Sequence, residues 1–266
     1  MIQMMKQKNF TRVLPWLIPG GLLICWFVIC EAEWVPRYLM PHPTDVLMSM
    51  SSYMFAELGS VPYAGRFLTD LYASGVRVIL GFLLAVILGL PLGLLSGRLS
   101  CAQQVLGMFL NALRAVPGIC WLPLALVWFG IGIKTTVFLI AMAAFFPIYL
   151  NAEAGARQVN PVILQAGAML GVGRLRGIFS VLLPAAMPNI VTGLRLGMGV
   201  SWAYLVLGEL TGVTNGLGAI IMDARMLGRI DIVVVGIILI ALIGRLSDSG
   251  LHSLMKICFK SARRAI

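Results

Sequence analysis

The chain has 266 residues, of which 60% are hydrophobic and 11% are charged, and its mean hydropathy is +0.96. These values exclude an ordinary soluble domain and predict a polytopic membrane protein with room for about five to seven helical spans of roughly 20 residues each. The formal charge of +10 does not by itself indicate nucleic-acid binding, because an excess of Lys and Arg in a membrane protein normally belongs to its cytoplasmic loops.

The first predicted span is residues 14–30, with Pro15 and Pro19 near its start. Three basic residues precede this apolar run, so a cleaved secretory signal is the alternative interpretation. An anchor helix is favoured because further spans follow. A polar connection at residues 31–70 comes next, with a short amphipathic helix expected at about residues 46–58.

The second span is predicted at residues 78–97, which contain no charged residue, and the third lies within residues 101–133. The third is unusual because it contains Arg114, Pro117 and Pro123. Prolines and a charge inside one span imply that freed backbone groups are bonded elsewhere and that one face is not exposed to lipid.

Three further spans are predicted at residues 135–150, 190–210 and 232–244. The fifth span has Arg195 near its start and Glu209 near its end. These two residues lie roughly 21 Å apart along a helix, so they could pair only through a neighbouring helix or subunit. Glu209 is therefore interpreted as a solvated acid at the end of a span.

The longest polar interruption after the first connection is residues 160–188, which reads as two short helices joined by a glycine turn. Asn160 can cap the first helix, and Pro161 fits the first helical position, where a missing N–H costs nothing. Gly171 closes that helix. The second helix is expected to bend or end at Leu183–Pro184, because a proline removes a backbone donor.

Six spans place both termini and residues 160–188 on the same side of the membrane. That side collects thirteen cations and two acids, and the opposite side seven cations and eight acids, so the net charges are about +11 and about −1. The first side is therefore predicted to be cytoplasmic. The basic balance follows from topology, and nucleic-acid binding is not indicated.

Residues able to form a catalytic site are few. The only histidines, His42 and His252, have no partners at metal-ligand or triad spacing, and neither HExxH nor GxSxG occurs. The sequence GIGIKT at residues 130–135 lacks a glycine directly before its lysine and is not a phosphate loop. A gradient-driven carrier needs an ionisable group at mid-membrane, and the sequence places only Arg114 deep within a span. The carrier is the first rival interpretation and a membrane enzyme the second.

The order Gln165-Ala166-Gly167, Gly171, Val181 and Leu183–Pro184 has the spacing of the cytoplasmic EAA loop of ABC-importer permeases. Gln165 stands where that family usually has Glu, and Gly167 where it often has Ala. Together with LRAVPGICWLPLALVWFGIG, FFPIYLNAEAG and GLGAIIMDAR, this loop resembles the permeases for nitrate, aliphatic sulfonates and taurine. The resemblance covers roughly Ser74 to the C-terminus.

The resemblance implies an all-α permease fold of the type I ABC importers, with about six transmembrane helices and both termini cytoplasmic, in the bacterial inner membrane. Residues 1–73 would form the anchor helix and external connection, and residues 74–266 the permease core with a cytoplasmic coupling loop at 152–189. The implied partners are a second copy of the chain, two cytosolic ATPase subunits and an external solute-binding protein. No cofactor is expected on this chain, since ATP and Mg²⁺ would bind the ATPase subunits.

The resemblance also assigns roles to individual residues. ATPase coupling falls on Gln165, Ala166, Gly167, Leu170, Gly171, Val172, Leu183 and Pro184. With Gln165 in place of Glu, an amide hydrogen bond would have to replace any salt bridge made at that position. From the residues themselves, and if the solute is an anion, an arginine in a broken span predicts a path at Arg114, Pro117, Trp121 and Trp128. The alternatives for Arg114 are that it bonds carbonyls freed by the kink or lies near a membrane interface. Nitrate, sulfonate, taurine and other small solutes all stay open.

Overall fold

The computed structural model describes residues 2–258, and every element of regular structure in that range is helical. The predicted cytoplasmic cations Lys260, Arg263 and Arg264 lie outside the described residues. The described chain forms two compact units, residues 2–68 with Ile220–Ile237, and Thr69–Ala219 with residues 238–258. Each is described by itself below.

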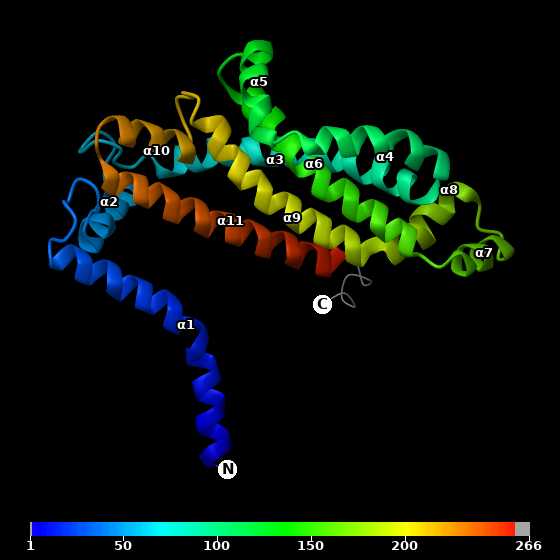
Figure 1. Cartoon of the computed structure of the whole chain (residues 1–266), viewed down its shortest axis with the longest axis horizontal. Coiled ribbons are helices and arrows are strands. Elements are labelled where there is room, and N and C mark those ends of the chain that lie inside the picture. Colours follow the sequence, from blue (N-terminus) through cyan, green and yellow to red (C-terminus); the bar gives the residue numbers. More distant parts are fainter. Residues whose placement is uncertain (1, 259–266) are drawn as a thin grey trace. The chain divides into compact units, whose positions relative to one another are not determined.

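The first unit contains α1 (Ile2–Glu31) and α2 (Pro43–Phe55) (Figure 1). α1 continues through both of its prolines rather than starting after them. The connection between α1 and α2 is held against α1 by a hydrogen bond, which the Trp26 indole N–H donates to the Pro41 carbonyl at 3.2 Å. His42 caps α2 by accepting the N–H of Thr44. The predicted amphipathic helix is therefore confirmed, starting three residues earlier than expected.

Within residues 2–258, four helices are long and apolar enough to cross a membrane by length and composition. They are α3 (Phe67–Arg98), α6 (Ile133–Gln158), α9 (Leu183–Glu209) with the turn before it, and α11 (Ile230–Cys258). A fifth span is broken: α4 (Ser100–Ala115) and the segment Gly118–Phe129 meet at an angle of 88°. In α1, Leu17–Glu31 forms a shorter apolar helix. The predicted break in the third span is thus confirmed.

The predicted spans are too short at several ends. α3 begins eleven residues before Val78, α6 runs eight residues beyond Leu150, and α11 continues to Cys258. The predictions ended where charged or polar residues appear, such as Asp70 and Glu153. A helix can continue through such residues when they find partners, and tertiary pairing therefore overrode the hydropathy pattern.

Within the second unit, α3, α6 and α9 pack at very short distances through glycine. A Cβ atom at Gly93 of α3 would lie 2.5 Å from the carbonyl oxygen of Tyr149, and one at Gly193 of α9 would lie 2.6 Å from the Cβ of Asn151, both on α6. Small residues permit this approach of helix backbones in membranes. Gly197 also meets α6, whereas a Cβ at Gly199 would meet nothing within 4 Å.

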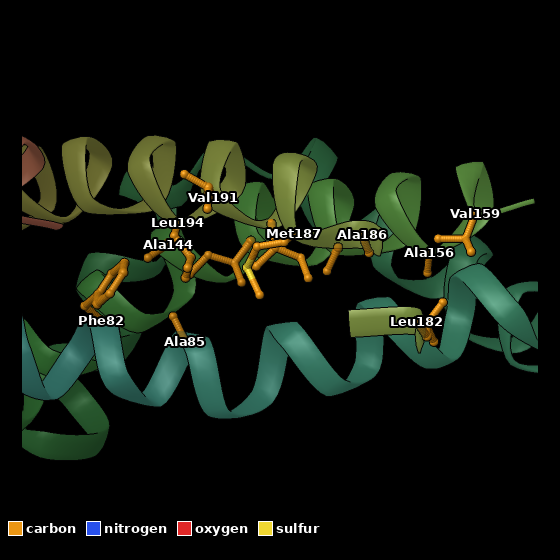
Figure 2. Packing of buried hydrophobic residues seen from close by; sticks show 13 residues of the cluster. Phe82, Ala85, Ala144, Ala156, Val159, Leu182, Ala186, Met187, Val191 and Leu194 are labelled. Carbon is orange, nitrogen blue, oxygen red and sulfur yellow. The ribbon is translucent and has the colours of Figure 1, made fainter. Parts of the chain in front are cut away.

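The apolar core of this unit joins the same three helices. Side chains from α3, α6 and α9 converge on one cluster, with Leu182 from the turn before α9 at one end (Figure 2). Ala85, Ala144 and Ile148 are each at most 1% exposed. This core fixes the first half of α9, from Ala186 to Leu194, against α6. The two ends of the 27-residue helix lie about 39 Å apart.

Candidate functional site

The predicted coupling loop is built around α7 (Pro161–Met169). Asn160 caps its start, since the side-chain oxygen accepts the N–H of Val162 at 2.9 Å, and Pro161 takes the first helical position. The sequence prediction for this end of the helix is confirmed.

α7 ends in a Schellman motif. Gly171 has φ +80°, its N–H donates to the carbonyl of Ala168, and the N–H of Val172 donates to the carbonyl of Gly167, both at 3.0 Å. A non-glycine residue would be strained at this φ. The predicted role of Gly171 in closing the helix and turning the chain is confirmed.

The two faces of α7 differ in exposure. Gly167 is buried and Leu164 is half-buried, packed against the apolar core. The opposite face is exposed and apolar, with Met169 and Leu170 89% and 85% exposed and Val162 and Ile163 also exposed. Gln165 and Ala166 are exposed beside them. An exposed apolar patch of this kind is typical of a surface that binds another protein.

Gly167 tolerates the residue that the EAA pattern often has. A Cβ atom placed there would lie 3.5 Å from Cγ2 of Val181, which is an ordinary van der Waals contact. The departure from alanine is therefore compatible with the same packing. Val181 is one of the pattern's other positions, so the spacing of the motif corresponds to a contact between the two halves of the loop.

The second half of the loop was expected to bend or end at Leu183–Pro184, and it does not end there. α8 (Arg174–Gly177) passes through a π-helical turn (Ile178–Leu182) directly into α9. Pro184 sits in the first turn of α9, where its missing N–H costs little, and Pro188 lies inside the helix. The loop is thus connected rigidly to a helix of the core.

A buried polar cluster occupies the other end of α9, and it overturns the interpretation of Glu209 as a solvated acid. Glu209 is 0% exposed. Its carboxylate accepts a hydrogen bond from the guanidinium of Arg77 and one from the hydroxyl of Ser74, the latter at 2.8 Å. Arg77, itself 8% exposed, also donates to the carbonyl of Asn215 at 2.6 Å.

The same cluster holds the start of α10 (Leu217–Met226). Three successive backbone N–H groups each find a side-chain acceptor: Gly216 on Asp70 at 2.9 Å, Leu217 on Ser74 at 2.9 Å, and Gly218 on Glu209 at 2.7 Å. These are the groups that a helix start leaves without backbone partners. α3, α9 and the first turn of α10 are therefore tied together by buried charge and hydrogen bonds.

This cluster could have been found in the sequence. Asp70, Ser74 and Arg77 follow the spacing i, i+4, i+7, which places them on one face of a helix. Starting the second span at Val78 left all three outside it. As a result, Glu209 near the end of another predicted span had no partner that the sequence pattern could identify.

Arg195 pairs within the chain and not with Glu209. Its guanidinium makes two hydrogen bonds, both of 2.9 Å, to the carboxylate of Asp248 on α11. A bidentate pair of this kind fixes both side chains in one plane. Residue 195 on α9 is thereby linked to α11 within the second unit.

The four predicted pathway residues lie around the break between α4 and α5 (Leu122–Phe129). Arg114 is exposed in the last turn of α4 and makes no hydrogen bond or ion pair with any residue of the described range 2–258. Its depth in the membrane stays a prediction. Because Arg114 donates no hydrogen bond to a carbonyl within residues 2–258, the alternative that it bonds carbonyls freed by the kink is not supported.

Pro117 precedes the 3₁₀ turn Gly118–Trp121, and Trp121 is half-buried. Trp128 is 55% exposed and packs edge-on against Phe129 and Phe138, so it belongs to an aromatic group. Within residues 2–258, no hydrogen bond or ion pair joins Arg114 to the other three positions.

Sequence reasoning did not identify Tyr204 of α9 as a neighbour of this break. A Cβ atom at Gly118 would overlap the Tyr204 hydroxyl, which shows how closely the ring covers the turn.

Comparison with known proteins places similar chains in one family. The family described as "Binding-protein-dependent transport system inner membrane component" matches residues 89–254. The taurine transport system permease protein TauC of Escherichia coli is 34% identical, covering 95% of each chain. An aliphatic sulfonates transport permease protein SsuC of Bacillus subtilis is 34% identical over 91% of this chain and 85% of its own length. The nitrate import permease protein NrtB of Synechocystis is 31% identical over 85% of this chain and 82% of its own.

A solved structure of the inward-facing MetNI methionine ABC transporter shares the fold. The TM-score is 0.60 at 20% identity, and the match covers 73% of this chain and 98% of that one. At this level of identity the likeness concerns the fold alone.

Proposed function

Because the chain belongs to the family of binding-protein-dependent transport system inner membrane components, we propose that it forms the path for a small anion and is driven by ATP through α7. The chain is a multi-pass permease of the bacterial inner membrane and a transport component rather than an enzyme. Its relatives are named for sulfonates, taurine and nitrate, so the proposed solute is a small anion or zwitterion of this group.

The outer face of α7 carries this proposal. A cytoplasmic helix nine residues long, capped at both ends, presents exposed apolar side chains that the rest of its own unit does not cover. In water such a patch favours a protein partner. The proposed partner is a cytosolic ATPase subunit, which would contact Gln165, Ala166 and Leu170. Gly167 and Val172 would pack the opposite face of α7 against the rest of the loop.

Motion at α7 would reach the membrane through its connections. Leu164 packs on the core, and α8 continues into α9 without an intervening loop. An ATPase can shift a transporter between two states only by binding one of them better than the other. A rigid connection from α7 to Leu183–Pro184 and α9 would convert that difference in affinity into movement of the spans.

A second copy of the chain is the proposed partner of the broken span. Val105, Met108 and Phe109 lie on one face of α4 by the i, i+3, i+4 spacing and are 68%, 85% and 63% exposed. A closed path around Arg114 requires side chains on its other side, which a second copy of the chain would supply. In a dimer, an arginine with no acidic partner would give that path a positive potential for an anion.

A gradient-driven carrier remains the alternative. Among the described residues of the second unit's spans, two acids are fully buried, Asp70 and Glu209. The carboxylate of Glu209 is engaged by Arg77, Ser74 and the N–H of Gly218, and that of Asp70 accepts the N–H of Gly216. A coupling acid must release and rebind a proton or ion during each cycle. A carboxylate held by three donors is better suited to fixing helices.

Reconstitution in proteoliposomes tests the proposal. The chain would be co-purified with its cytosolic ATPase subunits and supplied with its binding protein, and uptake of the solute found on that binding protein by mass spectrometry would be measured. We expect uptake that requires ATP and ATPase activity that the loaded binding protein stimulates. Uptake that persists without ATP and follows an imposed ion gradient would support the carrier instead.

A further inference from the structure

An apolar groove of about 610 Å³ runs between the last third of α3 and the α7–α8 segment. Its walls are formed mainly by Leu90, Leu94 and Leu95 on one side and by Leu164, Ile178 and Leu182 on the other. All of these residues belong to the second unit. The groove is separate from the exposed outer face of α7 and from the break around Arg114.

The length of the groove fits one leaflet of a membrane. From Leu90 to Arg98 the helix rises by roughly 12 Å, and the hydrocarbon of a single leaflet is about 15 Å deep. Both ends of this stretch lie in a helix long and apolar enough to span the bilayer. The apolar wall therefore runs over most of the depth that one acyl chain occupies.

Among the described side chains that line the groove, charge lies at one end. Arg98, in the last turn of α3, is the one charged residue of this described lining, and its side chain is exposed. Arg176, also exposed, directly precedes Gly177 of the lining. The described lining contains no acid, and charge counting places this end at the cytoplasmic surface, where anionic lipids gather.

We infer that the groove is a binding site for an anionic glycerophospholipid, with an acyl chain along Leu90–Leu95 and the phosphate at Arg98. Apolar walls with one terminal cation match a molecule that is apolar along its length and negative at its head. A helix of another protein would bury the same leucines but would not make the site prefer an anionic lipid over a zwitterionic one. The inference goes beyond the proposed function, because a carrier with the same spans would have the same site.

Two residues of α7, Leu164 and Ala168, also line the groove. A bound lipid would therefore fill space between α3 and the helix proposed to meet the ATPase. We expect anionic lipid to slow amide hydrogen exchange in α7, because a filled groove restricts its movement against α3.

Native mass spectrometry of the full-length purified chain tests this site with dioleoyl phosphatidylglycerol and dioleoyl phosphatidylcholine as probes. The parent chain should retain phosphatidylglycerol preferentially. In Arg98→Gln that preference should fall by about fivefold, the effect expected for one cation near an anionic headgroup. The matched control is Arg225→Gln, which removes another exposed arginine in the last turn of a helix and should change nothing.

A second pair of variants tests the apolar wall. Leu95→Trp, at an exposed position lining the groove, should lower retention of both lipids, whereas Leu80→Trp, exposed on α3 but outside the groove, should not. Melting temperatures of all four variants would confirm folding. Equal retention of the two lipids by the parent, or equal behaviour of Arg98→Gln and Arg225→Gln, would overturn the inference. These measurements need neither ATP nor transport, so they are independent of the proposed function.

Discussion

Replacing Glu209 with alanine should strongly destabilise the protein, because the buried cluster depends on its carboxylate. In the folded chain this group accepts hydrogen bonds from Arg77, Ser74 and the N–H of Gly218. Without it, Arg77 would remain only 8% exposed and would lack its ionic partner. Breaking a buried ion pair on one side costs about 3–5 kcal/mol, and an unsatisfied backbone N–H adds about 1–3 kcal/mol.

A loss of about 5 kcal/mol corresponds to a fall in melting temperature of roughly 10–20 °C for a protein of this size. Glu209→Gln should cost less, because the amide oxygen can still accept the Gly218 N–H. Combining Glu209→Gln with Arg77→Met should restore most of the loss, since an apolar replacement removes the unpaired charge. The double variant leaves the carbonyl of Asn215 without its donor, at a cost of about 1 kcal/mol.

Thermal melting of the detergent-purified chain, followed by size-exclusion chromatography, measures these differences. Glu57→Ala is the matched control, because it removes an exposed acid outside the cluster. If Glu209→Ala melts within 2 °C of that control, the cluster does not stabilise the fold as argued. If the double variant is less stable than Glu209→Gln alone, the ion pair is not the source of the loss.

Two other predictions concern helix packing and the cap of α7. Gly93→Ala should lower the free energy of unfolding by about 1–3 kcal/mol, because the added methyl group overpacks against α6. Gly75→Ala on the same helix, where a Cβ meets nothing within 4 Å, should raise it by about 0.5–1 kcal/mol. Equal melting temperatures of the two variants would contradict the close packing at Gly93. Asn160→Ala should speed amide exchange in α7 about fivefold, because the lost cap is worth about 1 kcal/mol. Asn160→Asp keeps the acceptor, so its α7 amides should exchange at the rate of the parent chain. If the α7 amides of Asn160→Ala exchange as slowly as those of the parent, Asn160 does not act as a cap.

The architecture was predictable where the sequence contains strong local signals. Uninterrupted apolar runs indicated the spans, and prolines beside Arg114 indicated the broken one. The start of α7 at Asn160 and its end at Gly171 followed from capping chemistry, which depends on neighbouring residues alone. Local rules were sufficient for these features because no distant partner decides them.

Features that depend on distant partners were missed. Glu209 was interpreted as solvated because its partners, Ser74 and Arg77, are 135 and 132 residues away in the chain. Arg195 finds Asp248, 53 residues later. The chain also continues as helix through Leu183–Pro184 rather than ending there, because a π-helical turn joins α8 to α9. Hydropathy shows where burying a polar or charged side chain costs free energy. It does not show which distant residue pairs with that side chain.

Binding-protein-stimulated ATPase activity and uptake, measured together in proteoliposomes for Ala166→Arg, test the central claim most directly. Ala166 is exposed on α7, so the substitution should leave folding and membrane insertion intact while placing a charged side chain in the proposed ATPase contact. Ser180→Arg, at an exposed position of the loop beyond α7, is the matched control. The account predicts that Ala166→Arg abolishes ATP-driven uptake and its stimulation while the control retains both. Normal ATP-driven uptake by Ala166→Arg would contradict coupling through α7.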